Sequence, residues 1–374
     1  FLLLKLKIIM NICIIGDGLT SLSLAKSLIN KEITVHLYYK DRIKHLSSNR
    51  TIGISKNNLE FFKKEIFNIP KKNYWEIKKI EIYLEKPVKD NLLRFENNEK
   101  NLFYMIKNEE LYKSIRSNIL KNKFFKKYKI KKDSFYPNLI KKNKYDLIIN
   151  CDSNNILSKK YFMKKIDKNY NNLAYTTIIK HKKIKNDVAT QVFTKSGPIA
   201  FLPLSSNETS IVCSLDVKRK KYNDNEVLDL IRKNNLKYQI QQIFKLTSFK
   251  LSSSILRKYY HENILAFGDL LHRIHPFAGQ GFNMNIRDIR ALLEIIQKKI
   301  DLGMQLDASI LNDFEKKTKN KNFIFSSGID FIYEIFNKEK KKININFNMI
   351  LKTIVKNKKL NNLFIKLADR GLNF

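Results

Sequence analysis

The sequence predicts an α/β fold, in which a Rossmann-like domain is interleaved with an antiparallel sheet and followed by a helical C-terminal tail. Three observations support this prediction. Two strand-turn-helix segments with glycine in the turn lie far apart in the chain, a third apolar strand between them ends in a carboxylate, and a group of short strands precedes the last segment. At 374 residues, the chain has room for one large domain with a second domain inserted.

The first strand-turn-helix segment lies near the N-terminus. Met10 to Ile15 form an apolar run typical of a buried strand, and Gly16-Asp17-Gly18 follows at once. Apolar positions at helical spacing begin at Leu22. Glycines at such a turn let the backbone approach a ligand, and the helix N-terminus binds phosphate through its N–H groups. The segment therefore predicts a dinucleotide-binding loop.

Two positions depart from the usual pattern of that loop. Ser21 stands where a third glycine is expected. The second strand, Thr34 to Tyr39, ends in tyrosine instead of the acidic residue that binds a ribose. Either Asp41 takes the place of this acidic residue, or the site binds the ribose more weakly.

A further apolar strand lies within Lys144 to Asp152 and ends in a carboxylate. In a doubly wound sheet, ligands bind beyond the carboxyl ends of the strands. We therefore expect Gly16, Asp152 and Asp269, which follows a later strand, to converge on one extended cofactor.

The later strand, Ile264 to Phe267, is connected to a long helix by a turn rich in hydrogen-bond donors. Glycines and amide side chains dominate this turn, together with one proline; its residues are Pro276, Gly279, Gln280, Gly281 and Asn283. From Asn283 onward, apolar residues recur at helical spacing. The turn should therefore lie at a helix N-terminus, where the dipole favours an anion or a ring that becomes anionic.

Four short strands are expected between these segments, and turn residues separate them. They are Thr176 to Ile179, Thr190 to Thr194, Ile199 to Leu204 and Thr209 to Leu215. Their spacing predicts an antiparallel sheet.

Charge alone does not indicate a nucleic-acid partner. Lys and Arg number 72 against 35 Asp and Glu, which gives a net charge of +37. The lysines are spread over the whole chain, and no nucleic-acid-binding motif accompanies them. Attraction to anionic membrane surfaces is an expected by-product of the charge.

The cysteines and histidines do not form metal-binding patterns. Cys13, Cys151 and Cys213 are isolated in apolar strands, which indicates a reducing, cytoplasmic location. His272 and His275 lack a third ligand at zinc spacing, and we expect His275 to shape the turn that follows it.

Residues Phe347 to Leu372 have the pattern of a basic amphipathic helix. Docking onto the protein's own core and attachment to the inner face of a membrane are both consistent with this pattern. The start, Phe1 to Ile9, is interrupted by lysine and is too short to span a bilayer.

These segments resemble the FAD-dependent aromatic-ring monooxygenases, most closely the ubiquinone-biosynthesis hydroxylases that act on polyprenylated phenols. Gly16-Asp17-Gly18 looks like the first FAD motif of that family, and the strand with HPFAGQGFNMNIRD looks like the second. Four more stretches match: Arg50 to Ser55, Tyr104 to Glu109, Phe193 to Leu204 and Leu367 to Leu372. The resemblance covers nearly the whole chain.

The resemblance implies FAD as cofactor. Gly16 and Gly18 would admit its ADP part, Asp152 and Asp269 would bind it beyond the strand ends, and Arg50 would contact it by motif position. The flavin ring would lie at Pro276, Gly279, Gln280, Gly281 and Asn283. No residue stands out as a general base. Departures from the family pattern are Ser153 in place of glycine, Leu270 and Leu271 in place of small residues, and Lys159 or Lys160 as the only basic counterparts nearby.

The implied domains are interleaved. An FAD-binding domain takes residues 10–70, 101–170 and 256–300, a substrate domain takes 71–100 and 171–255, and a helical C-terminal region takes 301–374.

The implied activity is hydroxylation of a polyprenylated phenol in ubiquinone biosynthesis. It would proceed through a flavin hydroperoxide, with O2 as oxidant and NAD(P)H as electron donor. A membrane surface and a quinone-biosynthesis complex are the expected partners. Two alternatives are a prenyl reductase of the same fold and a non-catalytic member of such a complex, the latter suggested by Ser21, Tyr39, Ser153 and Leu271.

Overall fold

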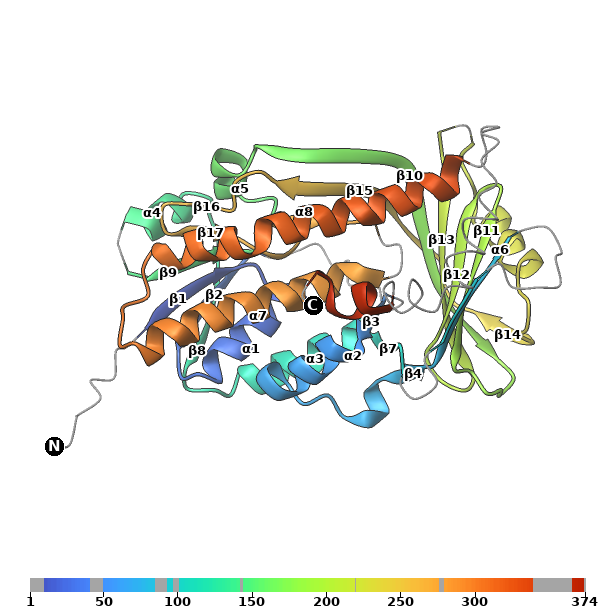
Figure 1. The fold of residues 1–374 in the computed structure, drawn as a ribbon, viewed down its shortest axis with the longest axis horizontal. Coiled ribbons are helices and arrows are strands. Elements are labelled where there is room, and N and C mark those ends of the chain that lie inside the picture. The colour runs from blue at the N-terminus through green and yellow to red at the C-terminus, as the bar shows by residue number, and fades with distance from the viewer. Residues whose placement is uncertain are drawn as a thin grey trace.

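The computed structural model describes residues 10–40, 50–84, 93–96, 101–141, 144–218, 220–275, 279–338 and 365–372. Two large sheets and one small sheet are joined and covered by helices (Figure 1). The α/β fold predicted from the sequence is confirmed. Of the predicted amphipathic tail, residues 347–364 lie outside the described part, whereas 365–370 form a short helix.

The first sheet is the Rossmann-like part of the molecule. Its order is β16-β17-β9-β1-β2-β8, with β16 antiparallel to β17 and the other pairs parallel. Ile12, Cys13 and Ile14 are consecutive in β1 and all fully buried, so both faces of the sheet are covered. The strands are β1 (Asn11–Ile15), β2 (Thr34–Tyr39), β8 (Phe125–Lys129), β9 (Leu147–Asn150), β16 (Tyr260–His261) and β17 (Ile264–Ala266).

Two long helices, α7 (Gln280–Asp301) and α8 (Ser309–Lys338), run side by side across the molecule (Figure 1). The N-terminal helix α1 (Leu19–Ile29) packs against α7 and against α3 (Asn108–Ile119). The remaining helical segments are α2 (Lys56–Phe61), η1 (Phe62–Ile66), η2 (Lys71–Asn73), α4 (Phe135–Lys141), α5 (Ile156–Tyr161), α6 (Asp224–Lys233) and η3 (Gly268–Leu270). Within the described residues, no helix is long and apolar enough to cross a membrane.

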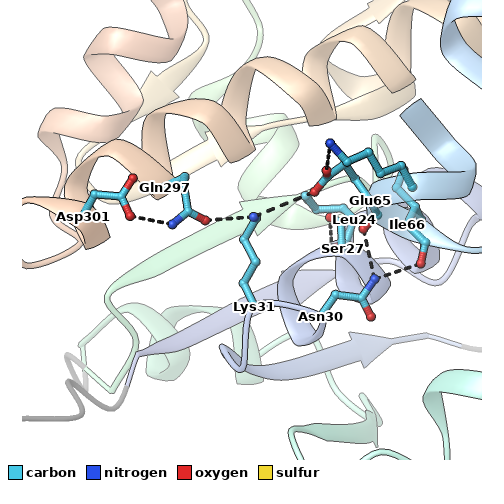
Figure 2. A network of polar contacts seen from close by, with 9 residues as sticks. Leu24, Ser27, Asn30, Lys31, Glu65, Ile66, Gln297 and Asp301 are labelled. Carbon is cyan, nitrogen blue, oxygen red and sulfur yellow. Dashed lines mark hydrogen bonds and ion pairs between the residues drawn. The ribbon is translucent and has the colours of Figure 1, made fainter. Parts of the chain in front are cut away.

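A polar network fixes the C-terminal end of α1 against two neighbours (Figure 2). Lys31 Nζ donates to Gln297 Oε1 of α7 at 2.8 Å and lies 3.9 Å from a carboxylate oxygen of Glu65 in η1. The Asn30 amide donates to the backbone oxygens of Glu65 and Ile66, both at 3.0 Å. The network lies at the end of α1 opposite to its glycine turn, so it holds the helix in place without occupying that turn.

The second sheet is large and mostly antiparallel. Its order is β18-β15-β10-β13-β12-β11-β5-β6, and β14 pairs with β10. The four strands predicted here are confirmed within β10, β11, β12 and β13, except that β12 ends one residue before the predicted Leu204. The strands are β5 (Lys79–Leu84), β6 (Leu93–Glu96), β10 (Lys165–His181), β11 (Val188–Thr194), β12 (Gly197–Pro203), β13 (Glu208–Asp216), β14 (Ile240–Ile243), β15 (Thr247–Leu256) and β18 (His272–Arg273).

The small sheet lies where the two large sheets meet. It consists of β3 (Thr51–Ser55), β7 (Phe103–Lys107) and β4 (Trp75–Ile77), all antiparallel neighbours. Thr51 Oγ1 donates to Ser210 Oγ of the second sheet at 2.9 Å. Because β3 also packs against α7, this small sheet connects the Rossmann-like part to the second sheet.

Two long strands of the second sheet contain the expected domain boundaries. β10 and β15 pair along most of their length, and β15 extends to β18, which directly precedes the donor-rich turn. The expected domain boundaries at residues 170 and 255 fall inside these two continuous strands. The expected boundaries thus divide single strands of the second sheet, and the division into domains stays a prediction.

Candidate functional site

The carboxyl ends of three neighbouring strands meet at one edge of the first sheet. Ile15 of β1 is paired with Asn150 of β9, which is in turn paired with Ala266 of β17. The residue after β1, Gly16, has a φ of +106°, and a Cβ there would lie 3.5 Å from the backbone nitrogen of Asp152. The structure thus brings Gly16 and Asp152 together, as the sequence predicts.

The residues that follow the third strand, β17, contact the first helix, α1. Gly268 has a φ of +64°, and a Cβ there would lie 3.2 Å from Cγ2 of Thr20, in the first turn of α1. Asp269 follows and is exposed. Asp269 thus directly follows a residue that lies against the first turn of α1.

The N-terminus of α1 is left open. Gly18 is the N-cap, in an extended conformation, and no side chain in the described part of the chain caps the helix. Among the described residues, a Cβ at Gly18 would have no neighbour within 4 Å. The first N–H groups of α1 therefore face a space that a ligand's phosphate could enter.

A lysine that the sequence analysis did not find lies beside this turn. Lys127 of β8 places its Nζ 3.5 Å from a carboxylate oxygen of Asp17 and 4.0 Å from the ring centre of Tyr39. Burial has the largest effect on the pKa of Lys127 and lowers it, while the charge of Asp17 raises it. The position that usually holds an acidic residue is thus a tyrosine covered by a cation.

The donor-rich turn leads directly into α7. Gly279 is the N-cap, in the left-handed region with a φ of +64°, and a Cβ there would lie 3.8 Å from the backbone nitrogen of Gly53 in β3. We expected the helix to begin at Asn283, but it begins at Gln280, because the glycine at 279 makes the required turn alone. Gly281 therefore lies in the first helical turn and not in the loop. Pro276 is outside the described residues.

Gln280 and Gly281 differ in what surrounds them. The Gln280 side chain is buried, and its Oε1 has no hydrogen-bond partner among the described residues. A Cβ on Gly281 would meet no atom of the described residues within 4 Å. The start of α7 thus presents a buried acceptor and open space together.

The amide of Asn283 binds the protein itself. Its Nδ2 donates to the backbone oxygen of Gly53 at 2.9 Å, and its Oδ1 accepts from the backbone N–H of Ser55 at 2.9 Å and from Nδ2 of Asn58 at 3.0 Å. The side chain is buried. We expected this amide to contact the cofactor, whereas these bonds use it to attach β3 and α2 to α7.

The remaining expected contacts lie on the surface of the site. Arg50 is exposed and precedes β3, where its backbone oxygen accepts from the N–H of Asn108 at 3.0 Å. Asp152 is half-buried, and its Oδ1 accepts from the N–H of Asn154 at 3.0 Å, which closes the turn after β9 despite the serine at 153. Leu271 is fully buried in the main core, so it packs against protein.

The two histidines near the turn have separate surroundings. His272 is buried and bonded to Asp288, whose other oxygen accepts from Asn322 at 3.0 Å. His275 is packed between the rings of Tyr170 and Tyr333, with centroids 4.7 Å and 4.2 Å away. Burial lowers the pKa of His275 to about 3, so its ring is neutral at pH 7. The described residues contain no group of three or more metal-ligating side chains that could hold an ion.

Comparison with known proteins identifies related sequences. A family described as an FAD binding domain matches residues 155–304. The 3-demethoxyubiquinol 3-hydroxylase of Escherichia coli is 30% identical over 156 residues, which are 40% of this chain and 40% of that protein. The mitochondrial ubiquinone biosynthesis monooxygenase COQ6 of Dictyostelium discoideum is 24% identical over 422 residues, covering 88% of this chain and 84% of that protein. The match thus extends over less than half of the first relative and most of the second.

Solved structures share the fold over almost the whole chain. The p-nitrophenol 4-monooxygenase PnpA of Pseudomonas putida has a TM-score of 0.74 at 10% identity, covering 96% of this chain and 98% of its own. A single-residue variant of HpxO from Klebsiella pneumoniae, complexed with FAD, has a TM-score of 0.70 at 13% identity and covers 96% and 99%. At these identities the likeness concerns the fold alone.

Proposed function

The chain belongs to the FAD-dependent monooxygenases of ubiquinone biosynthesis, and from this premise we propose that it hydroxylates the aromatic ring of a polyprenylated phenol. The family and the FAD cofactor predicted from the sequence are confirmed. The choice of substrate follows the names of the relatives, which include a ubiquinone hydroxylase of Rhodospirillum rubrum.

The observation that best supports the proposal is the fit of FAD to this edge of the sheet. Gly16 and Gly18 add no side chain to the turn before α1, and no side chain of the described residues caps the N-terminus of α1. At the other end, Gly281 faces open space beside the unpartnered Oε1 of Gln280. A dinucleotide needs a phosphate site and a ring site joined by a passage, and both ends have the required chemistry.

We assign residues to the two ends of FAD on this basis. The pyrophosphate would bind the N–H groups of α1 beyond Gly18, and Asp269 would accept hydrogen bonds from hydroxyl groups of the cofactor. Arg50 and Asp152 would contact it from the rim, where both are at least partly exposed. Gly279, Gln280 and Gly281 would hold the flavin ring.

When bound, FAD would accept electrons, with NAD(P)H as the proposed donor, and would activate O2 so that one oxygen atom is inserted into the ring. The chain's contribution is electrostatic. The α7 N-terminus supplies N–H groups and a positive dipole end, which would stabilise negative charge on the pyrimidine part of the ring. Because its ring is neutral, His275 adds no positive charge next to this turn.

A general base is not required by this chemistry, because the phenol's own hydroxyl already enriches the ring in electrons. The second sheet would hold the substrate, since β3 and β18 connect it to both edges of the turn. Because the proposed substrate has a polyprenyl tail, we also propose that the protein makes peripheral contact with a membrane. The net charge of +37 would favour binding to anionic lipid. A quinone-biosynthesis complex remains the proposed protein partner.

The visible absorption spectrum of the purified protein, before and after FAD is added, tests the cofactor. We expect flavin absorption bands that correspond to nearly equal amounts of bound FAD and protein. Next, oxygen uptake on addition of NAD(P)H and a polyprenylated phenol tests the reaction, with a hydroxylated product as the expected outcome. A folded protein that takes up no FAD would contradict the proposal and indicate a structural role, and a saturated prenyl chain without oxygen uptake would indicate a reductase.

A further inference from the structure

A cavity of about 290 Å³ lies between α7, α8 and the C-terminal turn. Met284, Ala291, Phe325 and Leu372 form its apolar wall. Its lining includes none of the residues that we assign to FAD. The cavity is thus a separate feature of the fold.

Arg287 of α7 lines this cavity with an unpaired guanidinium. Both terminal nitrogens, Nη1 and Nη2, are buried and have no hydrogen-bond partner among the described residues. Its Cζ lies 4.3 Å from the ring centre of Phe325. Gly371 is also close to the guanidinium, since a Cβ there would lie 2.8 Å from Nη1, and glycine avoids this contact.

A buried guanidinium without an acceptor costs the folded state several hydrogen bonds. Burial lowers the pKa of Arg287 to about 10, so the group is still protonated at pH 7. The acidic neighbours are already engaged. Asp288 accepts from His272 and Asn322, and Asp369 accepts from the backbone of Asn57.

The other charges around the cavity are predominantly positive. Arg290, Lys317 and Lys321 also line it, against the carboxylates of Asp288 and Glu294. Arg290 donates only to neutral oxygens of Asn57, at 2.8 Å and 3.2 Å, and its Nε has no partner within the described residues. Glu294 is paired with Lys317 at 2.5 Å. An excess of positive charge therefore remains at the two arginines.

We propose that this cavity binds a phosphate group, with Arg287 as its bidentate ligand and the apolar wall holding the body of a small organic phosphate. A guanidinium fork matches two oxygens of a phosphate, and an anion with two negative charges suits the excess of positive charge. The phosphate of a free metabolite and the phosphate headgroup of a lipid share this chemistry. The proposal is independent of the hydroxylase activity.

The test is thermal unfolding of the FAD-saturated protein during titration with inorganic phosphate, with sodium chloride at matched ionic strength as reference. Saturation with FAD keeps the titrant out of the pyrophosphate site. We expect phosphate to raise the unfolding temperature in a saturable manner. Arg287→Met should abolish that rise, and Arg287→Lys should weaken phosphate affinity by roughly tenfold or more, because the charge stays and the fork is lost.

A structural role for Arg287 would give a different pattern. If the guanidinium only supported the fold, Arg287→Met would melt earlier than wild type without phosphate, whereas removal of an unpaired buried cation should leave the unfolding temperature equal or higher. The matched control is Lys316→Ala, an exposed lysine of α8 outside the cavity, which should keep the full phosphate response.

Sedimentation with phosphatidylcholine vesicles, with and without phosphatidic acid, separates the two sources. Arg287-dependent binding to the phosphatidic acid vesicles alone would assign the site to a lipid headgroup, and a response to inorganic phosphate would assign it to a soluble phosphate. Absence of both responses, or responses that Arg287→Met and Arg287→Lys leave unchanged, would overturn the proposal.

Discussion

Asn283→Ala should destabilise the protein strongly and weaken FAD binding with it. The Asn283 amide is the buried link between α7 and β3, through the backbone oxygen of Gly53 and the N–H of Ser55. Both edges of the proposed flavin site depend on this link, since Gly279 lies against Gly53. The variant therefore tests whether the site is held in shape by this one side chain.

The structure sets the size of the effect. Truncation leaves two buried backbone groups without partners, at about 1–3 kcal/mol each. The Asn58 amide loses its 3.0 Å bond but keeps a longer one to the backbone oxygen of Asn283, at 3.4 Å. Water that enters the vacated space would recover part of the loss. We therefore expect the free energy of unfolding to fall by about 2–5 kcal/mol.

Urea unfolding of the FAD-free protein measures this change, and a flavin fluorescence titration measures the affinity. Asn320→Ala, at an exposed position of α8, is the control and should change the free energy of unfolding by less than about 0.5 kcal/mol. A loss below about 1 kcal/mol in Asn283→Ala, with unchanged FAD affinity, would show that this side chain does not hold the site in shape.

The other predictions concern the turns and the pH dependence. Gly281→Trp should fold, because a side chain there points into open space, but the purified protein should lack flavin absorbance and activity; full turnover would contradict our placement of the ring. Gly16→Ala should cost about 1–3 kcal/mol of stability because of the φ of +106°, whereas Gly18→Ala should keep the fold and lose FAD affinity, and calorimetry with FAD titration compares the two. His275 stays neutral when folded and binds a proton when unfolded below pH 6.5, so stability should fall as the pH drops from 6.5 toward 3. Between pH 7 and pH 5 this amounts to about 2 kcal/mol, which His275→Phe should remove; an identical pH profile in the variant would rule this out.

Strand positions could be predicted well from the sequence where burial decides the pattern. The second strand was expected at Thr34 to Tyr39, and β2 has those bounds. This agreement follows from an apolar run between turn residues, a local signal that needs no partner. The convergence of Gly16 and Asp152 could also be predicted, because parallel strands of one sheet end at the same edge.

Side-chain partners were harder to predict, because they depend on residues far away in the chain. The partner of Asp17 is Lys127, 110 residues later, on a strand whose position beside β2 no local pattern reveals. Asn283 has an amide suited to a ligand, yet the amide binds β3, 228 and 230 residues away. The start of α7 was missed by one helical turn, because glycine is a weak helix former and Gly281 is nevertheless helical.

A single turnover under labelled oxygen shows whether the FAD-loaded protein inserts oxygen into a phenol ring. The protein is saturated with FAD, reduced chemically without air, mixed with a polyprenylated phenol and exposed to oxygen-18 gas, so that the natural electron donor is not needed. We predict one labelled oxygen atom in the ring of the product, as measured by mass spectrometry. If the flavin is reoxidised but every polyprenylated phenol tested is recovered unchanged and unlabelled, the proposed hydroxylation is contradicted.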